Sequence, residues 1–168
     1  LKDFSRSSFS DSVSVLNAVS LTNEYIAHEH GEEGMFATLF FGVVDPSTGL
    51  LAYINGGHEP LIIVGSDGIK KRLKPSGPAV GMMPGSKYTM RKTQLDRGDI
   101  LFGYTDGVTE ARSPADELYT RKRLEKSVEN SKLATATDFS ENVKSDLFKF
   151  IEKAPQSDDI TMLTVLWG

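Results

Sequence analysis

Apolar residues recur at helical spacing near both ends of the chain. In the first segment the apolar stripe consists of Val15, Leu16, Val19 and Ile26. This spacing predicts a helix over about residues 11–28, with Ser10 as a candidate cap. A second stripe predicts an amphipathic helix between Thr137 and Glu152, and Pro155 ends it because proline cannot continue a helix. We therefore expect helices at both ends of the fold.

Between these helices the pattern is typical of strands. The apolar run MFATLFFGVV (residues 35–44) predicts a strand covered on both faces. Alternating polar and apolar residues at 88–93 predict an exposed strand. Further strands are predicted at Leu50–Asn55, Pro60–Val64, Ile100–Tyr104 and Ile160–Trp167, the last two buried. At least six strands in antiparallel order, with helices at both ends, favour an α+β sandwich of two mainly antiparallel sheets.

The amino-acid composition excludes several kinds of functional site. The 168 residues include 19 basic and 23 acidic side chains, a net charge of −4, and no cysteine. Disulfides, thiolate zinc sites and cysteine nucleophiles are therefore excluded, and the acidic balance gives no electrostatic reason to expect nucleic acid or an anionic membrane. No apolar stretch approaches a membrane span, so we expect a cytoplasmic protein. The chain begins with Leu1 rather than Met, which predicts a processing or fragment boundary.

Acidic residues stand at the ends of two predicted buried strands. Asp106 follows one strand and precedes Gly107, whose missing side chain allows backbone or ligand to approach closely. Asp158 and Asp159 open the last strand, where neighbouring side chains point to opposite faces, so only one of them faces a given site. Carboxylate oxygens suit Mg²⁺ or Mn²⁺. From the residues alone, an ordinary turn at Asp106 and a solvated cap at Asp158 are the favoured interpretations of these patterns.

Four motifs occur in a characteristic order along the chain. They are MFATLFFGVVD (35–45), NGGHEP (55–60), YTDGVTEAR (104–112) and DDIT (158–161). Together they resemble the SpoIIE/RsbU-type branch of the PPM protein serine/threonine phosphatases. The resemblance covers nearly the whole chain and implies an α-β-β-α sandwich. It also implies two Mn²⁺ or Mg²⁺ ions that activate a water for attack on phosphorus.

The resemblance assigns roles to individual residues. Asp106 and Asp158 match metal-binding residues and would therefore also be catalytic, while Asp159 is expected in a second-shell or structural role. Asn55 is expected to fix the turn that carries His58. His58 itself would lie near phosphate or a metal-coordinated water, or serve only as a hydrogen-bonded turn residue. Gly107 accompanies Asp106 in the same motif.

Two features depart from the family pattern. The family's N-terminal motifs, which include the Asp that bridges the two metal ions, are absent from this sequence. Either those residues precede Leu1 in a longer protein, so that the domain over residues 1–168 is N-terminally incomplete, or the chain is a metal-deficient relative. Thr120 stands where the family usually has Gly after an aromatic residue, so we expect the loop at 113–121 to be remodelled.

The resemblance further implies a function and partners. We expect a phosphatase acting on a phosphorylated anti-sigma-factor antagonist in a bacterial partner-switching pathway. It would be the C-terminal output module behind a sensor or receiver domain, and the sequence leaves a homodimer open. The alternative is a catalytically inactive adaptor with the phosphatase fold. A nucleic-acid module has little support, because the basic runs at 70–72 and 121–123 are short and typical of solvated faces.

Overall fold

The computed structural model describes residues 4–131 and 135–168, which form two compact units. One unit comprises residues up to His58 together with Pro75–Gln94, and the other comprises Glu59–Lys74 together with Leu95–Gly168. Leu1, where the sequence predicts a boundary, lies outside the described residues. Each unit contains one antiparallel sheet with its own helices, so the predicted α+β class with two antiparallel sheets is confirmed.

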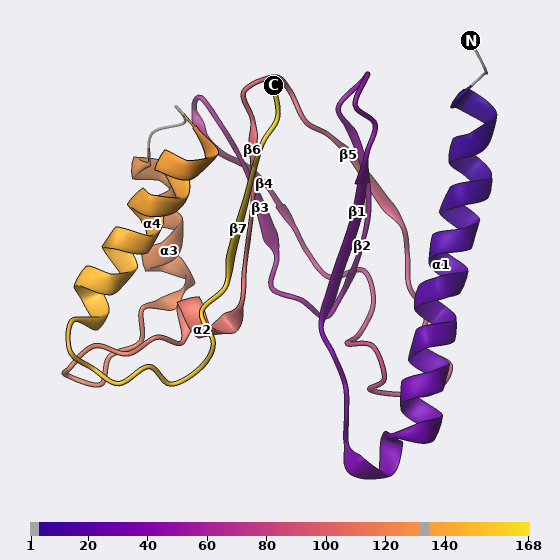
Figure 1. The fold of residues 1–168 in the computed structure, drawn as a ribbon, viewed down its shortest axis with the longest axis horizontal. Helices are drawn as coiled ribbons and strands as arrows, with labels where there is room; N and C mark the ends of the chain where they lie inside the picture. The colour runs from indigo at the N-terminus through magenta and orange to yellow at the C-terminus, as the bar shows by residue number, and fades with distance from the viewer. Residues whose placement is uncertain (1–3, 132–134) are drawn as a thin grey trace. The chain divides into compact units, whose positions relative to one another are not determined.

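The first unit combines helix α1 (Phe4–Glu29) with a three-stranded sheet in the order β1-β2-β5 (Figure 1). Its strands are β1 (Leu39–Val44), β2 (Leu50–Gly56) and β5 (Arg91–Gln94), and a short 3-10 helix at Gly31–Glu33 links α1 to β1. Val19 of α1 is buried against Ile54 and Val80, as the predicted apolar stripe requires. The register pairs Leu39 with Gly56 and Tyr53 with Arg91.

A buried amide fastens α1 to the loop before β5. Asn23 is fully buried; its side-chain oxygen accepts hydrogen bonds from the Gly81 backbone N–H (3.0 Å) and the Tyr88 hydroxyl (2.9 Å). Its amide nitrogen donates to the Met83 carbonyl (2.9 Å). One side chain thus satisfies three groups on the loop, which fixes the position of α1 along it.

Asn23→Ala is therefore expected to lower the free energy of unfolding by about 2–3 kcal/mol, because it leaves buried hydrogen-bonding groups without a partner. Urea unfolding followed by circular dichroism measures this. Asn17→Ala is the matched control, since Asn17 is exposed on the same helix. Equal stability of the two variants would show that the amide does not hold α1.

The second unit is a four-stranded sheet in the order β4-β3-β6-β7 (Figure 1). Its strands are β4 (Gly68–Leu73), β3 (Leu61–Gly65), β6 (Ile100–Tyr104) and β7 (Met162–Leu166). Helices α3 (Thr120–Asn130) and α4 (Ala136–Ile151) pack on one face of it, and a single turn, α2 (Asp106–Thr109), follows β6. Phe102 of β6 packs edge-to-face on Phe139 of α4 in the core between sheet and helices. Burying a side chain of this size contributes about 2–3 kcal/mol.

Several predicted boundaries were wrong. Helix α1 begins at Phe4, so Ser10 lies inside it and does not cap it. The strand predicted over 35–44 begins at Leu39. Val43 is 53% exposed, so β1, which is an edge strand, is not covered on both faces as predicted. The last strand is likewise an edge strand, with Leu163 59% exposed, whereas the burial predicted for Ile100–Tyr104 is confirmed.

Two elements were missed and one was misplaced. The strand β4 and the helix α3 have few apolar residues, since each carries one of the basic runs, so periodicity did not reveal them. The strand expected at 88–93 covers Arg91–Gln94, and Tyr88, expected to be exposed, is buried through its hydroxyl contact with Asn23. The predicted helix over 137–152 is confirmed as α4, one residue earlier at each end.

Candidate functional site

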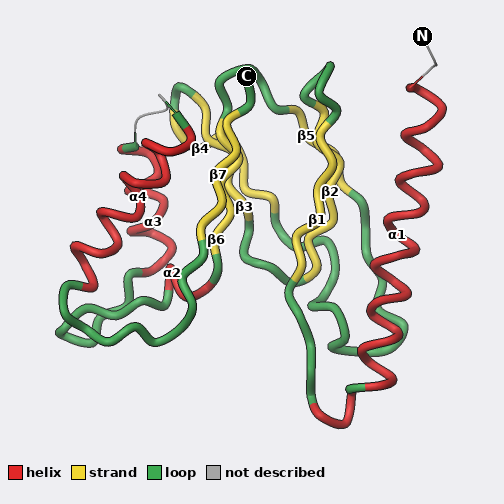
Figure 2. The backbone as a smooth tube through the Cα atoms, in the orientation of Figure 1, coloured by secondary structure: helices red, strands yellow, loops and turns green. Residues whose placement is uncertain are grey.

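The candidate site lies at one edge of the four-stranded sheet, where β6 ends and β7 begins (Figure 2). These strands are antiparallel neighbours, with Tyr104 paired to Met162. Continuing that register sets Thr105 beside Thr161, and the Thr105 N–H donates to the Thr161 carbonyl oxygen (3.1 Å). The loops that carry Asp106 and Asp158 are therefore brought side by side by strand pairing.

Thr105 locks the two loops together with its side chain. Its hydroxyl donates to the Asp159 carbonyl oxygen (2.9 Å) and accepts from the Thr161 N–H (3.0 Å). With the backbone bond, three hydrogen bonds connect this one residue to the opposite loop. Residue pattern alone did not single out Thr105, although its place between a buried strand and Asp106 was a usable signal.

Gly107 permits the closest approach of the two loops. A Cβ atom added at Gly107 would overlap the Asp159 carbonyl oxygen and lie 3.0 Å from its carbonyl carbon. Gly107 is buried and helical, so the missing side chain serves the approach of backbone rather than an unusual φ angle. The close backbone approach expected at Gly107 is confirmed.

The carboxylates themselves are exposed at this edge. Asp106 accepts a hydrogen bond from the Gly107 N–H (3.0 Å), and Asp158 accepts one from the Asp159 N–H (2.7 Å), so each carboxylate is oriented by the backbone next to it. Neither Asp106 nor Asp158 forms a salt bridge within residues 4–131 and 135–168. Two oriented, exposed carboxylates on adjacent loops offer hard oxygen ligands to a divalent cation. Across the described ranges, however, no group of three or more His, Cys, Asp or Glu side chains is arranged to hold a metal ion.

A third acidic residue borders the same sheet edge. Glu59 precedes β3, which pairs with β6, and the register places it beside Thr105. Its carboxylate accepts from the Arg121 guanidinium (2.8 Å) and from the Tyr104 hydroxyl (3.4 Å). Burial and the nearby Glu59 carboxylate raise the pKa of Tyr104 to about 12. Tyr104 therefore stays protonated at neutral pH and acts as a hydrogen-bond donor there.

Asn55 and His58 belong to the other compact unit and form a turn of their own. The buried Asn55 side chain accepts from the His58 backbone N–H (2.8 Å), so Asn55 fixes this turn as expected. The His58 ring nitrogen Nδ1 lies 3.0 Å from the Thr38 hydroxyl. His58 is thus a hydrogen-bonded turn residue, one of the two roles that the sequence left open.

The segment after α2 is a closed turn with unusual backbone. Arg112 donates to the Asp116 carboxylate (2.7 Å), and the Tyr119 N–H donates to the Ala111 carbonyl oxygen (2.8 Å). Asp116 and Thr120 both adopt positive φ, at 62° and 69°. Thr120 therefore holds the left-handed conformation that glycine adopts without strain, so the backbone at this position favours glycine.

The sequence of this chain is similar to those of several known proteins. The family model described as Stage II sporulation protein E (SpoIIE) matches residues 1–167. Protein IcfG of Synechocystis sp. is 53% identical over 153 residues, which is 91% of this chain and 24% of IcfG. Phosphoserine phosphatase RsbU of Bacillus subtilis is 25% identical over 141 residues, 83% of this chain and 42% of RsbU. The chain thus spans less than half of each of these relatives.

Two solved structures show the same fold. The SiaA PP2C domain of Pseudomonas aeruginosa superposes with a TM-score of 0.78 at 18% identity, covering 91% of this chain and 61% of that chain. The SpoIIE phosphatase domain of Bacillus subtilis, presoaked with Mn, superposes with a TM-score of 0.60 at 16% identity, covering 77% and 56%. The family model matches nearly the whole chain, which therefore belongs to the SpoIIE family.

Proposed function

We propose that this chain is part of a metal-dependent serine/threonine protein phosphatase that hydrolyses a phosphoprotein in the cytoplasm. The observation that carries the proposal is the convergence of the Asp106 and Asp158 loops, locked by Thr105, in a chain of the SpoIIE family. The named activity of RsbU as a phosphoserine phosphatase supports it. No helix within the described residues is long and apolar enough to span a membrane.

In this proposal Asp106 and Asp158 are metal ligands and catalytic residues, and Mn²⁺ or Mg²⁺ is the cofactor. Such ions, when bound, lower the pKa of a coordinated water and neutralise charge on the phosphoryl oxygens. The carboxylate oxygens fit either ion, and the Mn-soaked SpoIIE domain supports the choice of metal. Asp159 would have a positioning role, because its carbonyl oxygen, rather than its carboxylate, ties the loop to Thr105.

Two carboxylates are few for a site that holds two divalent ions, even when waters complete the octahedral coordination of each ion. We therefore propose that further ligands come from residues outside this sequence, within a longer protein in which residues 1–168 belong to one phosphatase domain. That domain would be the output module of a sensor or receiver protein, able to form a homodimer. An anti-sigma-factor antagonist of the partner-switching type is the proposed substrate, and Asn55 and His58 are proposed to lie near the phosphate.

The second candidate function is that of an inactive adaptor which binds a regulatory protein. The observation that favours it is the lack, within residues 4–131 and 135–168, of a cluster of three potential metal ligands. An adaptor has no need for two exposed carboxylates oriented at one sheet edge, so the phosphatase is the better supported of the two.

The test is phosphate release by the full-length protein from a phosphoserine peptide and from p-nitrophenyl phosphate. We expect turnover with Mn²⁺ or Mg²⁺ and none after chelation with EDTA. An adaptor would release no phosphate from either compound at any metal concentration. Turnover that persists in EDTA would contradict the proposed metal dependence.

A further inference from the structure

Two basic runs that are distant in the sequence lie side by side in the second unit. Helix α3 packs on β4, and Arg72 of β4 donates to Glu125 of α3 (2.6 Å). Together β4 and α3 carry seven basic and two acidic residues, a net charge of +5, in a chain whose total is −4. Carboxylates of other elements pair with three of these cations: Asp96 and Asp99 with Lys70, Glu59 with Arg121, and Glu117 with Arg123. A smaller excess of positive charge therefore remains on this part of an acidic molecule.

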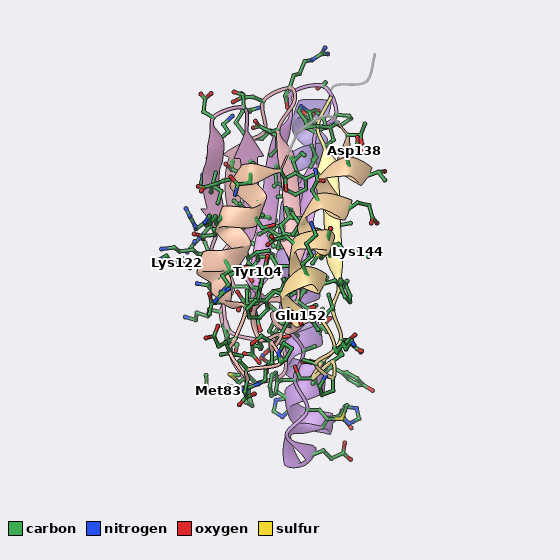
Figure 3. The ribbon with its side chains drawn as sticks, turned by 90° about the vertical axis from the view of Figure 1, so that its left-hand side faces the viewer. Met83, Tyr104, Lys122, Asp138, Lys144 and Glu152 are labelled. Carbon is green, nitrogen blue, oxygen red and sulfur yellow. The ribbon has the colours of Figure 1, made fainter. Side chains whose placement is uncertain are left out.

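The outward side of α3 continues this charge. Lys122 and Lys126 are one helical turn apart and both exposed, and neither takes part in an ion pair within the described part of the chain. Figure 3 shows Lys122 projecting away from the ribbon of α3. The buried residues of α3, Leu124, Ser127 and Val128, occupy the opposite side. We call Arg72, Arg121, Lys122 and Lys126 the basic surface.

One end of the basic surface reaches the edge that carries Asp106. Arg121 donates to Glu59 (2.8 Å), and the Tyr104 hydroxyl donates to the same oxygen (3.4 Å). Tyr104 is the last residue of β6, two positions before Asp106. Arg121 is 53% exposed in its side chain, so this ion pair is open to solvent and of the kind that contributes little to stability. A guanidinium held here by one carboxylate retains donors for another anion.

We propose that the basic surface docks acidic residues that flank the phosphorylated side chain of a protein substrate. This inference rests on the proposed phosphatase function. The partner is identified by charge complementarity, because a positive face beside the candidate site attracts and orients an acidic segment. Solvation of the two runs, which the sequence alone favours, does not account for their lying side by side with Arg121 next to the edge that carries Asp106.

The experiment compares two synthetic phosphoserine peptides of equal length, one with Asp and Glu flanks and one with Gln flanks. At low ionic strength the full-length protein should hydrolyse the acidic peptide with a kcat/KM about 10-fold higher than the neutral one. Lys122→Glu/Lys126→Glu should remove this preference and leave hydrolysis of p-nitrophenyl phosphate unchanged. The matched control is Lys149→Glu/Lys153→Glu, which changes the net charge by the same amount. Lys149 lies on α4 and Lys153 just after it, and both are exposed, so this variant should keep the preference.

A binding measurement separates this inference from the proposed function. Fluorescence anisotropy with non-hydrolysable phosphonate versions of both peptides requires no turnover, so it tests docking even in a protein without phosphatase activity. Tighter binding of the acidic peptide, lost in the Lys122/Lys126 variant only, supports the docking surface. Equal binding of the two peptides overturns the inference. The same titration with duplex DNA provides a second check. If Lys122→Glu/Lys126→Glu bound DNA more weakly than the parent but kept the preference for the acidic peptide, the basic surface would be a nucleic-acid site and the inference would be overturned.

Discussion

Asp106→Asn is expected to lower metal-dependent phosphate release by the full-length protein at least about 100-fold, because it removes the charge of a proposed metal ligand. The same result is expected for Asp158→Asn, whose loop is tied to the Asp106 loop through Thr105. Steady-state kinetics with p-nitrophenyl phosphate over a range of Mn²⁺ concentrations measures both. The loss should appear in kcat and in the metal concentration required for half-maximal activity.

Stability provides the control for these two variants. Asp106 and Asp158 are exposed, so replacing either with Asn should change the free energy of unfolding by less than about 0.5 kcal/mol. Asp67→Asn, in the exposed turn between β3 and β4, is the matched substitution and should retain full activity. Unchanged turnover in Asp106→Asn would remove this residue from the metal site.

Gly107→Ala is expected to lower the free energy of unfolding by about 3 kcal/mol and to reduce activity together with it. The added methyl group meets the backbone carbonyl of Asp159, which cannot rotate away as a flexible side chain could. Relief of the overlap requires that the Asp106 and Asp158 loops separate, which weakens the hydrogen bonds of Thr105. Thermal unfolding and phosphate release measured on the same preparation test both effects.

Gly31→Ala is the matched glycine substitution. A Cβ atom at Gly31 meets no atom within 4 Å, and its φ angle is not positive, so this variant should be as stable and active as the parent protein. If Gly107→Ala also behaved like the parent, the close approach of the two loops would not be a requirement of the site.

The parts of the fold that could be predicted are those with strong apolar periodicity. Helix α4 and the buried strand β6 were located to within a residue or two because their apolar residues face one core. The helix α3 was missed because only Leu124 and Val128 of its eleven residues are buried apolar side chains. Exposure of β1 was missed because an apolar run does not show how many faces a strand has covered.

The sequence pointed to the carboxylates of the candidate site but not to the hydrogen bonds and ion pair around them. Asp106 and Asp158 were singled out because each adjoins a strand end within a recognisable motif, and the structure joins the loops that carry them. The hydrogen bonds of Thr105 depend on the register of β6 against β7, which sequence spacing does not specify. The pair formed by Glu59 and Arg121 was likewise hidden, because it joins residues 62 positions apart.

The central claim is that Asp106 and Asp158 hold divalent metal ions, and calorimetric titration of Mn²⁺ into the full-length protein tests it without relying on turnover. The parent protein is expected to bind two ions, and the Asp106→Asn/Asp158→Asn double variant to lose at least one of them while its thermal unfolding stays the same. Unchanged stoichiometry and affinity in the double variant would contradict the claim.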